Sequence, residues 1–198
     1  MRDKSFALLV TPLAVMMRGR FLVLILMLGL FCSMISCSSI SDKTTELVGQ
    51  PVPDGRLMLL SGEDVALKNA SGRKQVILFW ATWCFHSKSV IASFEDLART
   101  YISRGDMDFY AVNLDKNQDL DLVKARIKVQ DLTTVTHVFS GNDTQDEAYL
   151  ALQGDHVPYA VFIDERSIVR YVGLGVSGLE EFLARRFGIP KANHLQSE

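Results

Sequence analysis

The chain has 198 residues, of which 48% are apolar and 22% charged, and its formal net charge is −2. This length suits one domain with a full core, whereas the charge balance excludes a nucleic-acid binder that depends on a basic surface. Three cysteines, Cys32, Cys37 and Cys84, are too few for a disulfide framework.

Residues 1–37 are predicted to be a targeting segment. The stretch "RGRFLVLILMLGLFCSMISC" combines basic residues, an apolar core and small residues around cysteine, which is typical of a signal peptide. As a helix, the apolar core from Phe21 to Ile35 would reach about 22 Å, short of the roughly 30 Å of a bilayer interior. We therefore expect a cleaved signal, with translation starting at Met1 or at Met16/Met17.

Cys37 is the expected lipidation site, because the preceding "MIS" resembles a bacterial lipobox. Cys32 is a poorer candidate, since bulky Phe31 precedes it. Ordinary cleavage nearby and an uncleaved anchor remain alternatives. Removal of residues 1–37 takes away four basic residues and one acidic residue, which leaves 17 basic and 22 acidic residues and a net charge of −5. After lipidation, Cys84 would be the one free thiol.

The remaining chain is expected to form a polar tether over residues 38–48, one domain over 49–188 and a tail over 189–198. Two apolar stretches at 56–60 and 65–68 predict a hairpin, because the turn residues "SGED" lie between them.

A nearly continuous apolar run at 75–81 predicts a central strand buried on both faces. Apolar residues then recur at intervals of three and four over 87–104, which predicts a helix with one buried face. The further elements are expected as strands at 107–115, 136–140, 159–164 and 168–173 and helices at 121–129, 143–152 and 179–187. This order predicts an α/β fold in which a mixed sheet carries helices on both faces.

Two motifs carry a family resemblance: "VILFWATWC", followed by the predicted helix, and "VPYAVFID" before a later strand. Over residues 49–188 the chain resembles thioredoxin-fold proteins of the TlpA type, which are secreted or membrane-tethered and exchange thiols with disulfides. The resemblance implies a thioredoxin-like fold with an N-terminal hairpin extension, located in the bacterial periplasm. It implies envelope proteins with thiols or disulfides as partners. No cofactor is expected, and the residues themselves indicate no metal site.

Cys84 is the candidate nucleophile. It lies between the predicted strand and helix, and a helix N-terminus favours a thiolate over a thiol. The resemblance implies that His86, like the histidine inside the C-x-H-C site of DsbA-like oxidants, stabilises this thiolate. It also places Trp83 on the partner-binding surface, while Trp80 is expected in the core.

The resemblance further implies that Pro158 is a cis-proline whose loop lies against Cys84. The backbone at Val157 would then be free to pair with an extended partner peptide. Small thiols are a further possible partner.

Ser87 stands where a dithiol site of this family carries its second cysteine, which gives the pattern C-x-x-S. A hydroxyl cannot act as the resolving thiol that releases a trapped partner. Leu78 and Val90 occupy positions where relatives carry acids. The residues therefore predict single-cysteine exchange, of an isomerase-like or glutathione-linked kind, rather than a self-contained oxidase or reductase.

The same residues bear on three other functions. The chain could be a non-catalytic binding module that holds a client in the groove beside the cis-proline. Metal handling has little support, because His137, His156 and His194 show no ligand spacing. A thiol peroxidase is disfavoured, since Ala81 stands where that motif needs threonine.

Overall fold

The computed structural model describes residues 46–68 and 71–188. The predicted targeting segment, including Cys37, and the predicted tail, including His194, lie outside the described residues. No helix in the described part of the chain is long and apolar enough to cross a membrane.

The packed part of the chain begins slightly earlier than expected. Leu47 lies within the expected tether at 38–48, yet its side chain is buried in the domain. The backbone N–H of Gly49 donates to the carbonyl of Val169, 2.8 Å away. The residues just before the expected domain start are therefore already tied to it, while residues before 46 lie outside the described part.

A five-stranded mixed sheet in the order β5-β4-β3-β6-β7 forms the centre of the domain. Its strands are β3 (Lys74–Trp80), β4 (Met107–Asn113), β5 (Thr136–Phe139), β6 (Tyr159–Ile163) and β7 (Val169–Leu174). The central strand β3 runs parallel to β4 and antiparallel to β6. Its side chains alternate between the two faces of the sheet and are almost all buried, as the continuous apolar run predicts.

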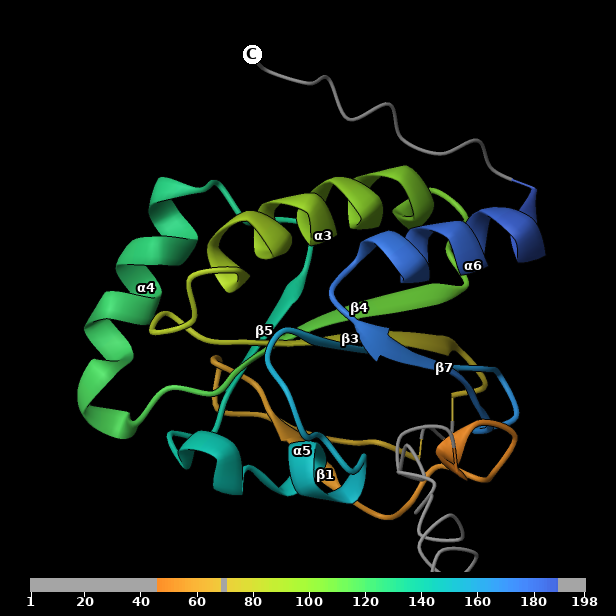
Figure 1. Cartoon of the computed structure of the whole chain (residues 1–198), viewed down its shortest axis with the longest axis horizontal. Helices are drawn as coiled ribbons and strands as arrows, with labels where there is room; N and C mark the ends of the chain where they lie inside the picture. The colour runs from red at the N-terminus through yellow and green to blue at the C-terminus, as the bar shows by residue number, and fades with distance from the viewer. Residues whose placement is uncertain (1–45, 69–70, 189–198) are drawn as a thin grey trace, which may run out of the picture. The chain divides into compact units, whose positions relative to one another are not determined.

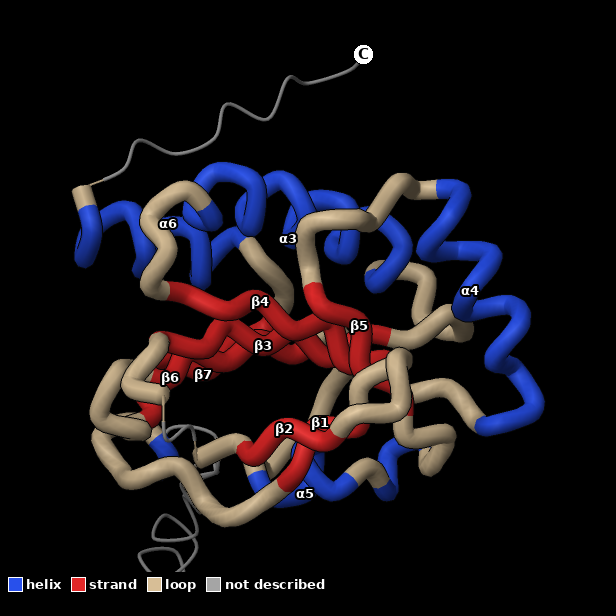
Figure 2. Tube along the Cα trace, turned by 180° about the vertical axis from the view of Figure 1, so that it is seen from behind, coloured by secondary structure: helices blue, strands red, loops and turns tan. Residues whose placement is uncertain are grey.

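Helices cover one face of this sheet and a hairpin with a short helix covers the other. The helices are α3 (Ser87–Ile102), α4 (Leu120–Val129), α5 (Glu147–Ala151) and α6 (Ser177–Phe187), with 3-10 turns at η1 (Asn117–Asp119) and η2 (Asp143–Gln145). Figure 1 shows α3 and α6 above the sheet and α5 below it. The antiparallel pair β1 (Arg56–Met58) and β2 (Asp64–Ala66) lies on the side of α5 (Figure 2).

Two apolar clusters form the core, one on each face of the sheet. Val76, Leu78 and Trp80 of β3 pack with α3 and α6, whereas Ile77 and Phe79 pack with the hairpin and α5. The expected core position of Trp80 is thereby confirmed.

One expected helix differs from the prediction. The stretch 143–152 begins as the 3-10 turn η2, and only Glu147–Ala151 form an α-helix. Asp146 is the reason, because its extended backbone ends the turn and its side chain accepts a hydrogen bond from the N–H of Tyr149 at 3.0 Å, which caps a new helix.

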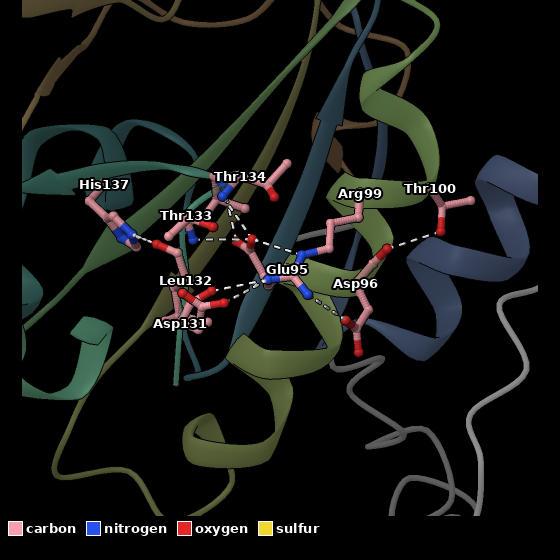
Figure 3. Close-up of polar contacts among 10 residues, drawn as sticks. Glu95, Asp96, Arg99, Thr100, Asp131, Leu132, Thr133, Thr134 and His137 are labelled. Atoms are coloured by element: carbon pink, nitrogen blue, oxygen red, sulfur yellow. Dashed lines mark hydrogen bonds and ion pairs between the residues drawn. The ribbon is translucent and has the colours of Figure 1, made fainter. Parts of the chain in front are cut away.

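Glu95 ties α3 to the segment between α4 and β5 (Figure 3). The residue is 2% exposed, and its carboxylate accepts hydrogen bonds from the backbone N–H groups of Thr133 (3.1 Å), Thr134 (2.7 Å) and Val135 (3.2 Å). Arg99, one turn later on α3, lies 3.3 Å from the same carboxylate. This buried acid therefore fixes where β5 joins the edge of the sheet.

Candidate functional site

Cys84 lies in the turn that joins β3 to α3. Its backbone N–H donates to the carbonyl of Ala81 at 3.3 Å, and its side chain is partly exposed. It is the one cysteine in the described part of the chain, and its thiol is free. The structure thus places the candidate nucleophile between strand and helix, with access to solvent.

The loop before β6 meets Cys84 directly. The Sγ atom of Cys84 lies 3.3 Å from the carbonyl oxygen of Val157, 73 residues away in sequence. The peptide bond between Val157 and Pro158 is cis, as expected. Cys84, Val157 and Pro158 are therefore brought together by the antiparallel pairing of β3 with β6, in which Phe79 lies opposite Tyr159.

Ser87 is turned away from solvent. It is fully buried as the first residue of α3, and its Oγ accepts a hydrogen bond from the N–H of Ala81 at 3.3 Å. The hydroxyl therefore closes the turn that carries Cys84. Three residues after Cys84, the chain therefore carries a hydroxyl oxygen that is already used in a structural hydrogen bond.

Exposed apolar side chains flank Cys84 in the sequence. Phe85 is 80% exposed and Trp83 is 57% exposed, although the Nε1–H of Trp83 donates to the carbonyl of Leu114 at 3.3 Å. Leu174, at the end of β7, is also largely exposed. Large apolar side chains that remain in solvent beside a partly exposed thiol are typical of a surface that contacts a partner.

Within the part of the chain that the structure describes, no hydrogen bond joins His86 to Cys84. Its ring lies edge-on to that of Phe85, with centroids 5.7 Å apart, and its backbone carbonyl accepts from the N–H of Val90 at 3.2 Å. The side chain is exposed and lines a groove beside the site. Its expected effect on the thiolate remains a proposal.

That groove has a volume of about 530 Å³ and runs between α3 and the start of α6. Val157 and Pro158 form part of its wall, so it is continuous with the thiol site. Of the two positions at which the resemblance implies an acid, Val90 also lines the groove, whereas Leu78 is buried in the core. The acid in this groove is Glu180 of α6, which the sequence analysis did not single out.

Asp115 is a further positioning residue that the sequence analysis missed. Its buried carboxylate accepts hydrogen bonds from the N–H of Thr82 at 2.8 Å and the hydroxyl of Thr82 at 2.6 Å. The side-chain amide of Asn113 donates to the same group at 2.6 Å. The sequence feature that could have indicated this role is the pair of polar residues at the carboxyl end of the strand beside β3. Neighbouring parallel strands end at the same edge of a sheet, so these residues are expected near the turn after β3.

Asp115→Asn is expected to destabilise the fold by about 1 to 2 kcal/mol, because an amide nitrogen would face the donors of Thr82. Urea unfolding of the purified chain measures this effect. Asp121→Asn is the matched control, since Asp121 is exposed at the start of α4 and should change stability by less than about 0.5 kcal/mol. Equal stabilities of the two variants would show that Asp115 does not hold the turn.

A model of the AhpC/TSA family matches residues 48–172. The chain belongs to the AhpC/TSA family. Thioredoxin-like protein YneN of Bacillus subtilis is 27% identical to this family member over 134 residues, which cover 67% of this chain and 75% of the relative. Thiol-disulfide oxidoreductase ResA of Oceanobacillus iheyensis is 29% identical over 106 residues, which cover 50% of this chain and 55% of ResA.

Solved structures show the fold of this AhpC/TSA family member. A thiol-disulfide oxidoreductase from Bacteroides fragilis matches it with a TM-score of 0.61 at 16% identity, over 69% of this chain and 99% of that one. StoA from Bacillus subtilis matches with a TM-score of 0.51 at 22% identity, over 64% and 91% of the two chains. The expected α/β, thioredoxin-like fold is confirmed. The chain is also similar in sequence to a thioredoxin-like protein and to a thiol-disulfide oxidoreductase.

Proposed function

We propose that this AhpC/TSA family member is an extracytoplasmic protein of the TlpA type that exchanges thiols and disulfides with envelope proteins through Cys84 alone. The observation that carries the proposal is the contact between Cys84 Sγ and the Val157 carbonyl oxygen, 3.3 Å apart, combined with the buried hydroxyl of Ser87. The first places a partly exposed thiol against a backbone edge that an extended peptide can join. The second leaves no resolving thiol at the expected position.

The exchange begins when the thiolate of Cys84 attacks a disulfide of the partner. A bond forms between Cys84 Sγ and one partner sulfur, the partner's S–S bond breaks, and the other partner sulfur leaves as a thiolate that takes up a proton. A thiol of the partner or a small thiol then attacks the mixed disulfide and releases Cys84. The same steps run in reverse when Cys84 begins as part of a mixed disulfide.

Residues around the thiol favour exchange with a protein over reduction of a peroxide. Ala81, three residues before Cys84, is buried and has no hydroxyl that could bind a peroxide oxygen. The neighbouring hydroxyl of Thr82 is engaged with Asp115 at 2.6 Å. Trp83 and Phe85, in contrast, present apolar surface to solvent, which suits a protein partner.

Membrane attachment is part of the proposal. Residues 1–37 would be the signal peptide, with Cys37 as the lipidated residue, and residues 38–48 would tether the domain at 49–188 to the membrane. The pattern of basic residues, apolar core and "MIS" before the cysteine supports this division. The protein would then face the periplasm, and residues 189–198 would form a tail.

Isolation of disulfide-linked complexes from cells tests the function. Free thiols are blocked before lysis, the tagged full-length protein is purified without reductant, and bound proteins are separated on a non-reducing gel and identified by mass spectrometry. We expect discrete complexes that reductant dissolves and that Cys84→Ser eliminates. Because Ser87 cannot resolve them, they should persist for longer than the mixed disulfides of a dithiol relative.

Two outcomes would contradict this function. Complexes that persist unchanged in Cys84→Ser would show that the thiol is not the group that captures partners. A Cys84→Ala strain that retains the full cellular role would instead identify a non-catalytic binding module.

A further inference from the structure

The groove beside Cys84 has mainly apolar walls. Val90 of α3, Leu174 of β7 and Val176 contribute to them, and the groove shares Val157 with the thiol contact. Its volume of about 530 Å³ lies within the range of sites that enclose small molecules or long side chains. A partner segment joined to Cys84 would therefore have a neighbouring side chain at the mouth of this groove.

Glu180 gives the groove its acidic character. It lies in the first turn of α6, is 6% exposed, and lines the groove together with His86. Glu180 already interacts within the chain, but a carboxylate has about four acceptor positions and can accept further hydrogen bonds. Apolar walls lower the local dielectric, so its interaction with a charge that enters the groove is stronger than at an open surface.

We propose that this groove selects partner proteins with a lysine or arginine next to the cysteine that Cys84 attacks. The inference rests on the proposed function, because it names the substrate class of the same site. The methylene stem of the basic residue would lie along Val90 and Val176, and its charged end would reach Glu180. A basic residue is the expected occupant because the groove is continuous with the thiol site and because its charge is complementary to that of Glu180.

Other side chains suit the groove less well. An apolar side chain would fill the space but would cover the Glu180 carboxylate without supplying a compensating charge, which is unfavourable. An acidic side chain would be repelled by the like charge. The expected order of reactivity is therefore basic, then apolar, then acidic.

Peptide disulfides test this order. The peptides are identical except for the residue beside their single cysteine, which is lysine, norleucine or glutamate, placed before the cysteine in one set and after it in another. Each peptide cysteine is linked to thionitrobenzoate through a disulfide. When Cys84 attacks the peptide sulfur, a Cys84–peptide disulfide forms, coloured thionitrobenzoate leaves as its thiolate, and the proton of Cys84 passes to solvent.

The full chain is used, with Cys32 and Cys37 replaced by serine so that Cys84 is its one thiol. We expect the lysine peptide to react about three to ten times faster than the norleucine peptide in at least one set. Glu180→Gln should remove this preference. Glu181→Gln is the matched control and should keep it, because Glu181 is half-exposed and pairs with Arg185 at 3.4 Å.

Equal rates for the three peptides would overturn the selectivity and leave the exchange function intact. This comparison uses the unchanged groove, so it decides the question even if Glu180→Gln does not fold. Release of thionitrobenzoate no faster than from a protein that also carries Cys84→Ser would overturn the proposed function, and the selectivity with it.

Discussion

Ser87→Cys is expected to reduce disulfide-linked complexes in cells at least about tenfold. A cysteine at this position would lie at the start of α3, three residues after Cys84, where a resolving thiol can attack the mixed disulfide from within the same chain. An intramolecular thiol has an effective concentration far above that of external thiols, so release of the partner becomes fast. The product is a disulfide between Cys84 and the introduced thiol in place of a trapped partner.

The measurement is the same non-reducing gel, supplemented by thiol counting on the purified protein. Ser89→Cys is the matched control, because it also adds a thiol to α3. Ser89 follows Ser87 by two residues, which corresponds to a rotation of about 200° around the helix axis, so this thiol lies on the opposite side of the helix. That variant should keep the complexes of the unchanged protein. If Ser87→Cys also keeps them, the missing second thiol does not limit release.

Glu95→Gln is expected to lower the free energy of unfolding by about 2 to 3 kcal/mol at neutral pH. The amide retains one acceptor oxygen, but its nitrogen would face backbone N–H groups of the segment before β5, and a buried donor without an acceptor is costly. Urea unfolding at pH 7 measures the difference. Asp96→Asn is the matched control, because Asp96 is exposed on the same helix and lies 3.9 Å from Arg99.

The Glu95 effect should depend on pH. Burial alone raises the pKa of this carboxyl, but hydrogen bonds from Thr134 and from the backbone of Val135 and Thr133 outweigh it, so the pKa lies below its ordinary value of 4.5. A lowered pKa in the folded state stabilises the fold above the unfolded pKa, and this contribution disappears as pH falls through the folded pKa.

The difference between the unchanged protein and Glu95→Gln should accordingly be full at pH 7 and shrink as the pH falls below 4.5. A difference that stays constant down to acid pH would show that the carboxylate charge does not contribute. A loss of stability in Asp96→Asn as large as that in Glu95→Gln would show that burial of the acid is not the cause.

The architecture could be predicted because the strongest patterns in the sequence are local. The apolar run of β3 marks a strand buried on both faces, and the spacing of apolar residues in α3 marks one buried helical face. The helix α5 was harder, since its start depends on a single side-chain cap at Asp146 rather than on periodicity.

Residues of the candidate site that belong to a local sequence motif could be predicted, whereas residues that reach the site through long-range contacts could not. Cys84, Ser87 and Pro158 belong to recognisable local patterns. Asp115 and Glu180 reach the site only because strand pairing and helix packing bring them there, and each would pass for an ordinary polar residue in the sequence. Acidic residues near sheet ends and in first helical turns are common, so only the fold distinguishes these two.

The carbonyl oxygen of Val157 has two competing uses. In the resting protein it accepts the hydrogen of the Cys84 thiol. In the proposed exchange, formation of a mixed disulfide would remove that hydrogen and would bring the partner chain close enough to donate a backbone N–H to the same oxygen. The reduced thiol would then compete with unreacted partners for this acceptor, whereas a partner whose sulfur has reacted would gain a second point of attachment.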